Sequence, residues 1–342
     1  MKTIRLGKTE LMVTKTAMGC LPVQRRSVED GAALIRAAFD GGIRFFDTAN
    51  AYTDSEKKIG IALHDVRDQV VIATKSASRT REGVLAHIEN SLKMLQTDYI
   101  DLFQFHNVTE VPDPNDPEGA YAGTLEAKRQ GWIRHIGVTS HRADVAEQCI
   151  ASGWFETLQF PYSYISTDRD LALADKCREA DMGFIAMKGL AGGLLNNARV
   201  CHAFMKDKEN VVPIWGIQTM EELRQWLDLA REDPGMDESL ARIIEKDRKQ
   251  LAGSFCRGCG YCMPCPVGIK INMAARMDML LRRSPWQGYY SAQWQEEMGK
   301  IEDCIGCRSC AKKCPYQLDT PNVLKYMLKD YRQFYEDHKH EL

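Results

Sequence analysis

Eight of the twelve cysteines in this chain of 342 residues are concentrated after residue 255. They form two runs, and in each run the last cysteine precedes a proline: Cys256, Cys259, Cys262 and Cys265, then Cys304, Cys307, Cys310 and Cys314. Tight C-x2-C runs in a reducing compartment indicate metal or redox sites rather than disulfides. Thiolates are the ligands that iron–sulfur clusters require, and eight of them are enough for two cubane clusters.

The spacing of the second run is the bacterial ferredoxin spacing for a [4Fe–4S] cluster, and the first run has one residue fewer before its last cysteine. Three closely spaced thiolates cap one face of a cluster, and the cysteine before proline typically ligates the other cluster. We therefore predict crossed ligation, with Cys256, Cys259, Cys262 and Cys314 on one cluster and Cys304, Cys307, Cys310 and Cys265 on the other. Two zinc ribbons are the alternative, because paired C-x2-C motifs also bind zinc.

A second set of reactive side chains follows consecutive apolar segments in the first two-thirds of the chain. Asp47 lies near the end of one such segment, Lys75 and His106 each end another, and Tyr52 comes shortly after the first of the three. A lysine ammonium beside a phenol lowers the pKa of the phenol, and a carboxylate orients the lysine. The histidine then directs a carbonyl oxygen at the phenol. Each residue alone is more typical of a solvated or paired structural group, so the hypothesis of a proton-transfer site depends on all four together.

These side chains need a scaffold that brings the segment ends to one level. Near-continuous apolar segments alternate with segments of helical period, which indicates a parallel sheet covered by helices. Eight strand candidates within about 230 residues predict a closed (β/α)8 barrel, whose chemistry sits at the carboxyl ends of its strands: 15–19, 43–49, 70–75, 99–106, 133–140, 157–162, 183–188 and 211–217. An open doubly wound sheet is the alternative, but residues 19–22 after the first strand lack its glycine-rich fingerprint.

The chain is expected to have two domains, a barrel over residues 1–232 and a cysteine-rich domain over residues 233–342. A break in the helical pattern at residues 232–235 marks the boundary. The 38 residues between Cys265 and Cys304 have helical periodicity over 272–283 and 292–300, which resembles the α-helical ferredoxin modules of multidomain oxidoreductases. Thr320 is the predicted N-cap of a last helix with Pro321 at its first position.

Composition restricts the function classes. The chain is 44% hydrophobic and 27% charged, which excludes disorder, and Lys+Arg is 45 against Asp+Glu at 47. A formal net charge of −2 gives no basic field for nucleic acid or an anionic membrane. No apolar run approaches the ~18–20 residues of a membrane span, and the first residues do not resemble a signal peptide. We expect a cytoplasmic protein with neither nucleic acid nor membrane as a partner.

The first 230 residues or so resemble the aldo-keto reductase family. The matching stretches are residues 42–52, Lys75, residues 98–102 leading to His106, and residues 131–140. The resemblance implies a (β/α)8 barrel and reduction of an aldehyde or ketone by a nicotinamide cofactor. It makes Tyr52 the general acid, Lys75 and Asp47 its tuners and His106 the orienting residue.

The same resemblance implies a set of residues in contact with the cofactor. Ser140 and Gln159 fall where the family holds the nicotinamide carboxamide, and the segment 187–193 falls where it wraps the pyrophosphate. The predicted cofactor residues are Ser140, Gln159, Met187, Lys188, Leu190, Gly216, Gln218 and Glu222.

Three positions depart from the family pattern. Met187 replaces the usual aromatic ring on the nicotinamide, and His141 stands where an asparagine is common. Glu222 aligns with the usual arginine for a 2′-phosphate, which a carboxylate repels. We therefore expect NADH to be tolerated or preferred, with Arg224 as a substitute partner for NADPH. The alternative is that Glu222 is a solvated helix residue.

Three functions remain open from sequence. The first is an NADPH- or NADH-dependent reductase of a small carbonyl substrate, or dehydrogenase of the alcohol, that carries two [4Fe–4S] clusters. The second is an electron-transfer protein whose clusters exchange electrons with a redox partner protein, the barrel serving as the two-electron end. A nicotinamide moves two electrons and a cluster one, so this second function needs a converter such as a flavin, for which no motif is evident. The third is a cluster-bearing scaffold on an inactive barrel.

Overall fold

The computed structural model describes residues 1–251, 255–258, 260, 262–283, 286–314 and 316–341. The chain divides into two compact units. The first comprises Met1–Gly189 and Ala198–Ala241, and the second comprises Leu190–Asn197 and Arg242–Leu342. The two units meet at residues 241–242, inside helix α9 (Glu238–Gln250). The domain boundary that the sequence predicts after residue 232 stays a prediction.

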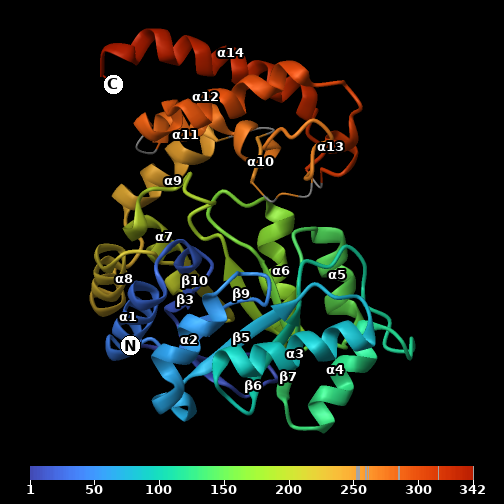
Figure 1. The fold of residues 1–342 in the computed structure, drawn as a ribbon. Coiled ribbons are helices and arrows are strands. Elements are labelled where there is room, and N and C mark those ends of the chain that lie inside the picture. The colour runs from blue at the N-terminus through green and yellow to red at the C-terminus, as the bar shows by residue number, and fades with distance from the viewer. Residues whose placement is uncertain (252–254, 259, 261, 284–285, 315, 342) are drawn as a thin grey trace. The chain divides into compact units, whose positions relative to one another are not determined.

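The first unit contains a closed barrel of eight parallel strands, as predicted from the alternating apolar segments (Figure 1). The strands are β3 (Ala17–Gly19), β4 (Phe45–Asp47), β5 (Val71–Ser76), β6 (Ile100–Phe105), β7 (Ile133–Thr139), β8 (Thr157–Pro161), β9 (Gly183–Met187) and β10 (Val211–Gly216). They are paired in chain order, and β10 closes the barrel by pairing with β3, where Ile214 faces Ala17. All carboxyl ends therefore lie at one face, where barrel chemistry is found.

Helices connect the strands and surround the barrel (Figure 1). They are α1 (Val28–Asp40), α2 (Ser55–Leu63), α3 (Arg81–Leu95), α4 (Ala120–Arg129), α5 (Ala143–Ser152), α6 (Asp168–Glu179), α7 (Ala198–Lys206) and α8 (Met220–Glu232). Ser27 is the N-cap of α1, because its hydroxyl accepts from the Asp30 amide at 3.0 Å. Helix α8 packs against both α7 and α1, so the outer ring closes as the sheet does.

A hairpin precedes the barrel and pairs β1 (Thr3–Arg5) with β2 (Met12–Thr14) in antiparallel register. Leu6, in its turn, is 1% exposed and packs with the side chains that fill the barrel interior, among them Phe45 and Val212. Gly7 has φ +54°, and a Cβ there would overlap the backbone at Met182 and Gly183. Only glycine therefore allows the hairpin to approach the end of the barrel where β9 begins.

The stretch 98–102 has a structural role outside the barrel interior. Asp101 accepts from Arg67 at 2.7 Å and from the Ile72 amide at 3.0 Å, which joins β6 to β5. The ring of Tyr99 lies between two guanidinium groups, 4.0 Å from that of Arg67 and 3.6 Å from that of Arg134. These contacts fix strand β6, which His106 directly follows.

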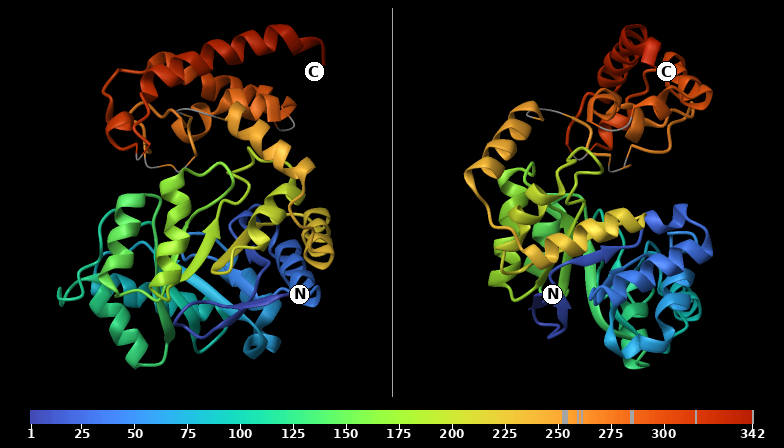
Figure 2. Two further views of the ribbon diagram at one scale, coloured as in Figure 1. Left: turned by 180° about the vertical axis from the view of Figure 1, so that it is seen from behind. Right: turned by 90° about the vertical axis from the view of Figure 1, so that its left-hand side faces the viewer.

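The second unit is helical, and its described residues contain no strand. Its elements after α9 are α10 (Ile271–Ala274), α11 (Met277–Arg283), η3 (Gln287–Tyr290), α12 (Ala292–Gly299), η4 (Lys300–Asp303), α13 (Ser309–Lys312), α14 (Thr320–His338) and η5 (Lys339–Glu341). In Figure 2 the long red helix α14 runs beside the shorter helices of this unit. The helical character predicted for this region is confirmed. The predicted cap of α14 is wrong by one residue, because Thr320 is already helical and Asp319 is the N-cap.

One apolar core holds the second unit together. It includes Leu324, Met327 and Tyr331 of α14 and residues of α10, α11 and α12. Tyr290 stacks on Tyr331 with ring centroids 4.5 Å apart, and its hydroxyl donates to the Tyr331 carbonyl at 2.8 Å. This unit therefore has a core of its own to support the cysteine loops.

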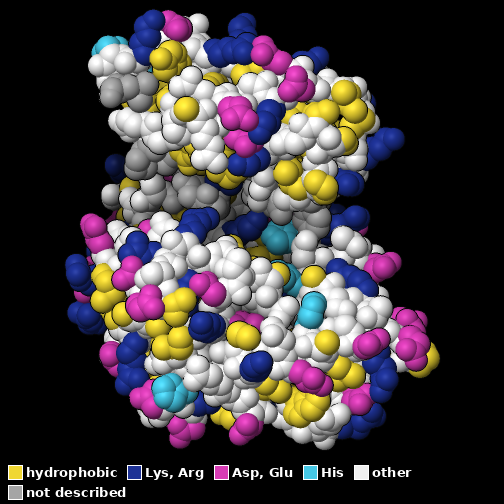
Figure 3. Space-filling view, in the orientation of Figure 1, with side chains coloured by type: hydrophobic (Ala, Val, Ile, Leu, Met, Phe, Trp, Pro, Cys, Tyr) yellow, Lys and Arg dark blue, Asp and Glu magenta, His cyan; other side chains and the backbone are white. Residues whose placement is uncertain are grey.

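Charges of both signs are interspersed over the surface. In Figure 3 the Lys and Arg side chains alternate with Asp and Glu on the face shown, in line with the formal net charge of −2. Among the described residues, no helix combines the length and apolar character that crossing a membrane would require.

Candidate active site and cysteine cluster

The four predicted proton-transfer residues come from neighbouring parts of the barrel. Asp47 is the last residue of β4, Lys75 lies in β5, and His106 directly follows β6. Tyr52 lies in the turn between β4 and α2, where its amide donates to the Ala49 carbonyl at 2.9 Å. Because these strands are adjacent and parallel, the fold brings the four side chains to the carboxyl-end face.

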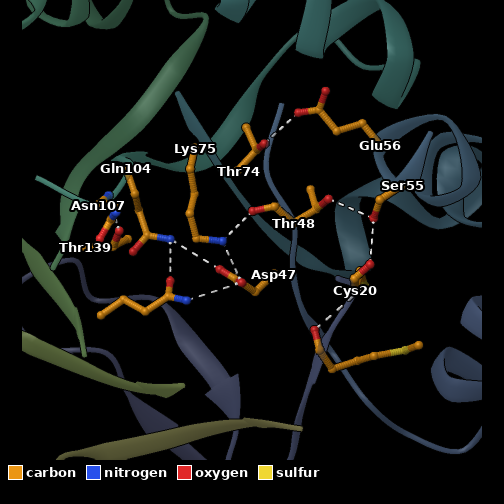
Figure 4. Close-up of polar contacts among 12 residues, drawn as sticks. Cys20, Asp47, Thr48, Ser55, Glu56, Thr74, Lys75, Gln104, Asn107 and Thr139 are labelled. Atoms are coloured by element: carbon orange, nitrogen blue, oxygen red, sulfur yellow. Dashed lines mark hydrogen bonds and ion pairs between the residues drawn. The ribbon is translucent and has the colours of Figure 1, made fainter. Parts of the chain in front are cut away.

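Lys75 and Asp47 form a buried ion pair (Figure 4). The Lys75 ammonium donates to Asp47 Oδ1 at 2.6 Å and also to the Thr48 carbonyl, and both side chains are at least 97% buried. Burial lowers the pKa of Lys75, but the charges of Asp47 and Tyr52 outweigh burial and raise it above its ordinary value. Lys75 is therefore a fixed positive charge at neutral pH.

The ring of Tyr52 lies beside this charge. The Lys75 ammonium is 5.3 Å from the ring centroid, and the ring meets that of His106 edge-on, with centroids 5.7 Å apart. Burial raises the pKa of Tyr52, and Lys75 lowers it by less than burial raises it. Lys75 thus acts in the direction expected from sequence, but the net shift is upward, because an enclosed phenol loses the water that would solvate its anion.

His106 is a neutral imidazole. Burial and the positive charges of Lys75 and Arg79 lower its pKa to about 3. A neutral ring keeps one N–H donor and one acceptor, and its backbone is fixed because the His106 amide donates to the Ser76 carbonyl at 2.8 Å. Such a ring can donate a hydrogen bond to an uncharged oxygen without bringing a second positive charge beside Lys75.

Sequence reasoning missed Gln104, which completes the polar network at the ion pair (Figure 4). Its amide nitrogen donates to Gln159 at 3.0 Å and to Asp47 at 3.3 Å, and Gln159 donates to Asp47 at 3.4 Å. Burial raises the pKa of Asp47 above its ordinary value, and the charge of Lys75 and the hydrogen bonds from these two amides act against that rise. The available signal was a glutamine in the middle of the apolar strand 99–106.

Cys20 also lies at this site although no role was assigned to it. It follows β3, its amide donates to the Asp47 carbonyl at 2.7 Å, and its carbonyl accepts from the Ser55 hydroxyl at 2.9 Å. Burial raises the pKa of the Cys20 thiol far above its ordinary value. The residue therefore packs as a small neutral side chain that joins β3 to α2.

The residues predicted to hold the nicotinamide lie on consecutive barrel strands. Ser140 follows β7, is fully buried, and donates to the Val108 carbonyl at 3.0 Å. Gln159 lies in β8, and Met187 is the last residue of β9. Lys188, which follows it, has φ +57°. Their contacts with a cofactor remain predictions, and so does that of Leu190, which belongs to the second unit.

Glu222 has a structural role at the start of α8. Its carboxylate accepts from the amides of Gln218 at 2.7 Å and Thr219 at 3.2 Å, while the Thr219 hydroxyl accepts from the Glu222 amide at 3.1 Å. This capping box stabilises the helix end after Gly216, the last residue of β10. The carboxylate is therefore held in place rather than freely solvated.

The cysteine runs approach each other within the second unit. Cysteines of both runs line one pocket, namely Cys262, Cys265, Cys304, Cys307 and Cys310. Burial raises the pKa of Cys310, and the charges of Cys304 and Cys307 raise it further, so these three thiols are neighbours. Cys256 and Cys314 contribute to the same apolar core or pack against it, and Cys259 lies outside the described residues. Soft thiol donors from two runs around one pocket fit an iron–sulfur cluster.

Within the ranges that the structure describes, no group of three or more His, Cys, Asp or Glu side chains is arranged to hold a metal ion. The described cysteines of the two runs lie on loops, except Cys310 in α13, and range from buried Cys256 to exposed Cys307.

Comparison with family models finds two matches. The model described as the aldo/keto reductase family matches residues 19–231, and the model described as a 4Fe-4S dicluster domain matches residues 255–319. Aldo-keto reductase YhdN of Bacillus subtilis is 35% identical over 176 residues, which cover 47% of this chain and 52% of YhdN. The uncharacterized oxidoreductase YqkF of the same organism is 23% identical over 258 residues, 71% of this chain and 83% of YqkF. The match to YhdN thus spans about half of that relative's length.

Solved structures share the barrel. The aldo-keto reductase AKR11C1 from Bacillus halodurans, in its holo form, superposes with a TM-score of 0.62 at 21% identity, over 72% of this chain and 96% of that one. The Bombyx mori aldo-keto reductase AKR2E4, solved in complex with NADP, gives 0.57 at 19% identity, over 72% and 92%. At these identities the similarity concerns the fold alone.

Proposed function

Since this chain belongs to the aldo/keto reductase family, we propose that it reduces a small aldehyde or ketone, or oxidises the matching alcohol, with NADPH or NADH. The observation that carries the proposal is the buried Lys75–Asp47 ion pair beside the ring of Tyr52, with His106 edge-on to the same ring. An acid, its tuning charge and a neutral hydrogen-bond donor at one face of a barrel suit carbonyl reduction.

Tyr52 supplies the proton. The nicotinamide, when bound, supplies the hydride to the carbonyl carbon. The Tyr52 hydroxyl is protonated at neutral pH and gives its proton to the carbonyl oxygen, which leaves a tyrosinate. The fixed ammonium of Lys75 stabilises that anion, so the negative charge that forms on Tyr52 when it gives up its proton lies beside a positive charge. In alcohol oxidation the same tyrosinate takes the proton back.

His106 and the ion pair position the reacting groups. The neutral imidazole of His106 donates a hydrogen bond to the carbonyl oxygen and turns it towards the Tyr52 hydroxyl. Asp47, held by Gln104 and Gln159, keeps the Lys75 ammonium directed at the site. Because Asp47, Lys75, Gln104 and Gln159 are buried, these charges act with little screening by water.

The cofactor residues follow from the family. We infer that Ser140 and Gln159 hold the carboxamide and that Met187 packs on the nicotinamide face. Lys188, Leu190, Gly216 and Gln218 are then assigned to the rest of the cofactor. Glu222, fixed by the capping box, repels a 2′-phosphate, which supports acceptance of NADH.

The second unit carries two [4Fe–4S] clusters in this proposal. The clusters, when bound, supply one-electron capacity. The pocket lined by Cys262 and Cys265 together with Cys304, Cys307 and Cys310 supports the close approach of the two runs that crossed ligation requires, in which Cys265 joins the second run. Cys256, Cys259, Cys262 and Cys314 then hold the other cluster.

The test of the barrel function is Tyr52→Phe. Oxidation of NADPH and NADH is followed with a panel of small aldehydes and ketones, and the variant is expected to lose about 10²–10⁴-fold in kcat. Tyr121→Phe is the matched control, since it removes a hydroxyl that donates to the Trp154 carbonyl in the outer part of the barrel. A Tyr52→Phe variant with native kcat on every substrate would contradict the proposal.

Electron transfer to a partner protein is a second candidate, and exposure of the second run favours it. Cys307 is exposed, and its neighbour Ile305 is 67% exposed. A ligand loop at the surface brings a cluster within reach of a partner's redox centre. Anaerobic titration of reconstituted protein with NADPH and NADH tests the link. Bleaching of the cluster absorbance in step with added cofactor supports electron transfer, and cofactor binding without bleaching contradicts it.

A further inference from the structure

Arg276 is a buried cation in the second unit. It lies between α10 and α11 and is 5% exposed, in contrast to Arg282 on α11, whose side chain is 49% exposed and paired with Asp330. Among the described residues no carboxylate forms an ion pair with Arg276, and its Nε has no hydrogen-bond partner. A buried guanidinium without a counter-charge is costly, so a compensating anion is expected beside it.

The surroundings of Arg276 belong to the first cysteine run. A Cβ on Gly258, at φ +64°, would overlap Nη1 of Arg276, so this glycine lets the loop pass directly over the guanidinium. The Gly258 amide donates to Cys256 Sγ at 3.4 Å, and the charge of Cys256 acts on Arg276. The cation thus lies against the loop that follows the first thiol of the run.

Arg276 also binds a segment that is distant in sequence but belongs to the same unit. Its Nη2 donates to the Gly192 carbonyl at 2.6 Å, and Gly192 lies in Leu190–Asn197. That segment is internally fixed, because the amides of Gly193 and Leu195 both donate to the Leu190 carbonyl. The family resemblance places residues 187–193 at the cofactor pyrophosphate, so one arginine contacts both the cysteine loop and a predicted cofactor segment.

We propose that Arg276 is the buried counter-charge of the iron–sulfur cluster held by the first cysteine run, and that it anchors the segment Leu190–Asn197 beside that run. The inference rests on the proposed function, because it requires the cluster. Four thiolates around an oxidised [4Fe–4S] core give a net charge of about −2, and adding one electron gives about −3 without a proton. A fixed cation favours the more negative form, so Arg276 raises the reduction potential of this cluster.

The experiment compares reconstituted full-length variants by redox titration. Arg276→Met removes the cation, Arg276→Lys keeps it, and Arg282→Met removes one charge from the exposed part of the same unit. Dithionite is the one-electron donor, EPR follows the reduced clusters, and iron and sulfide are counted in each preparation. Arg276→Met is expected to lower the midpoint potential of one cluster by at least 59 mV, which for one electron corresponds to a tenfold change in the reduction equilibrium. Arg282→Met and Arg276→Lys are expected to shift it by less.

The outcomes are distinguishable. If Arg276→Met keeps the native iron and sulfide content and its potentials match those of Arg282→Met, the counter-charge is disproved. If Arg276→Met loses the cluster, Arg276→Lys is compared with Arg276→Gln instead. Arg276→Lys is expected to retain the cluster. Arg276→Gln is expected to lose the cluster or to have a lower midpoint potential. Equal potentials in these two also overturn the inference. If the native chain takes up no iron or sulfide, the iron–sulfur part of the proposed function has failed.

The anchoring role has its own readout. Hydrogen exchange measured by mass spectrometry is expected to be faster over residues 190–197 in Arg276→Met than in Arg282→Met, because the bond to the Gly192 carbonyl is lost. Unchanged exchange over this segment would contradict the anchor while leaving the electrostatic result intact.

Discussion

The barrel site and the cysteine unit position their reactive groups in different ways. In the barrel, Asp47 and Lys75 lie in adjacent strands, and their polar atoms are satisfied by each other and by Gln104. In the second unit the thiols lie mainly on loops, from buried Cys256 to exposed Cys307, and are not gathered at metal-binding distances among the described residues. One site is organised by adjacent strands of a sheet, whereas the described thiols of the other are spread over loops.

The difference follows from backbone hydrogen bonding. A parallel barrel fixes the carboxyl ends of its strands whatever the substrate, so its polar groups are preorganised. Cysteine loops gain their binding free energy when thiolates coordinate the metal, and that energy contributes to folding. We therefore expect changes in the barrel site to alter rates, and changes in the cysteine unit to alter cofactor content and local stability.

Removal of the buried ammonium tests preorganisation most strongly. Lys75→Met is expected to lower kcat for carbonyl reduction by about 10²–10⁴-fold, because the tyrosinate loses its stabilising charge. Lys58→Met is the matched control, since Lys58 is equally buried and donates to the Val23 and Arg26 carbonyls and to Asp54 away from the site. Steady-state kinetics decide the comparison, with melting curves to measure folding. Similar kcat losses in the two variants would indicate a structural role for Lys75.

Paired cysteine variants test the ligand sets of the other region. Under crossed ligation, Cys265→Ala with Cys304→Ala removes two ligands of one cluster, so iron falls from about eight to about four atoms per chain. Under uncrossed ligation the same pair damages both clusters and iron falls further. The pair Cys256→Ala with Cys265→Ala gives the opposite pattern: it damages both clusters under crossed ligation and only one cluster under uncrossed ligation. Cys149→Ala, a buried cysteine of α5, is expected to leave the iron content unchanged.

The pH profile tests burial at the barrel site. The reductive reaction needs a protonated Tyr52, whose pKa is raised by burial against the pull of Lys75, so kcat/KM is expected to fall only above about pH 10. Alcohol oxidation needs the tyrosinate and should rise towards that pH. His106, with a pKa lowered to about 3 by burial and neighbouring cations, remains neutral, so no acidic limb is expected near pH 6.5. An acidic limb there that disappears in His106→Asn would contradict the neutral imidazole.

Cofactor preference separates the capping role of Glu222 from a repelling one. Glu222→Arg is expected to raise the NADPH-to-NADH affinity ratio by about tenfold, or about 1.4 kcal/mol. The same change breaks the capping box and costs about 1 kcal/mol of stability. Glu221→Arg, at an exposed position of the same helix, is the control for charge alone. The ratio is measured from dissociation constants obtained by fluorescence titration. If the native protein prefers NADPH and Glu222→Arg does not alter that preference, Glu222 does not repel the 2′-phosphate.

A smaller effect is expected from the scaffold of the barrel. Burial raises the pKa of Glu156, but hydrogen bonds from His135, Lys128 and the Ile136 amide outweigh it and hold the pKa at about 2. Stabilisation by this carboxylate is complete above the unfolded value of about 4.3 and is lost as pH falls through about 2. Glu156→Gln is expected to cost about 1 kcal/mol at pH 7, after allowance for solvent screening, by chemical denaturation. Glu110→Gln, in an exposed loop, should cost almost nothing.

Much of the fold was predictable because it depends on local patterns. Apolar segments of strand length, separated by helical periodicity, predict eight parallel strands, and the closed barrel confirms them. The helices between the cysteine runs were predictable for the same reason, since a helix face is set by residues a few positions apart. The placement of Leu190–Asn197 in the second unit was not, because it depends on packing between distant segments.

The sequence by itself determined the chemical inventory: the two cysteine runs, and the aspartate, tyrosine, lysine and histidine at successive strand ends. Residue type and spacing suffice for that inventory, because thiolate ligation and strand order are encoded locally. Only the tertiary structure decided that Gln104 completes the Asp47 network, that His106 is neutral and that the cation beside the first cysteine loop is Arg276. Those properties depend on burial and on distances between residues remote in the chain, which exist only once the elements have packed.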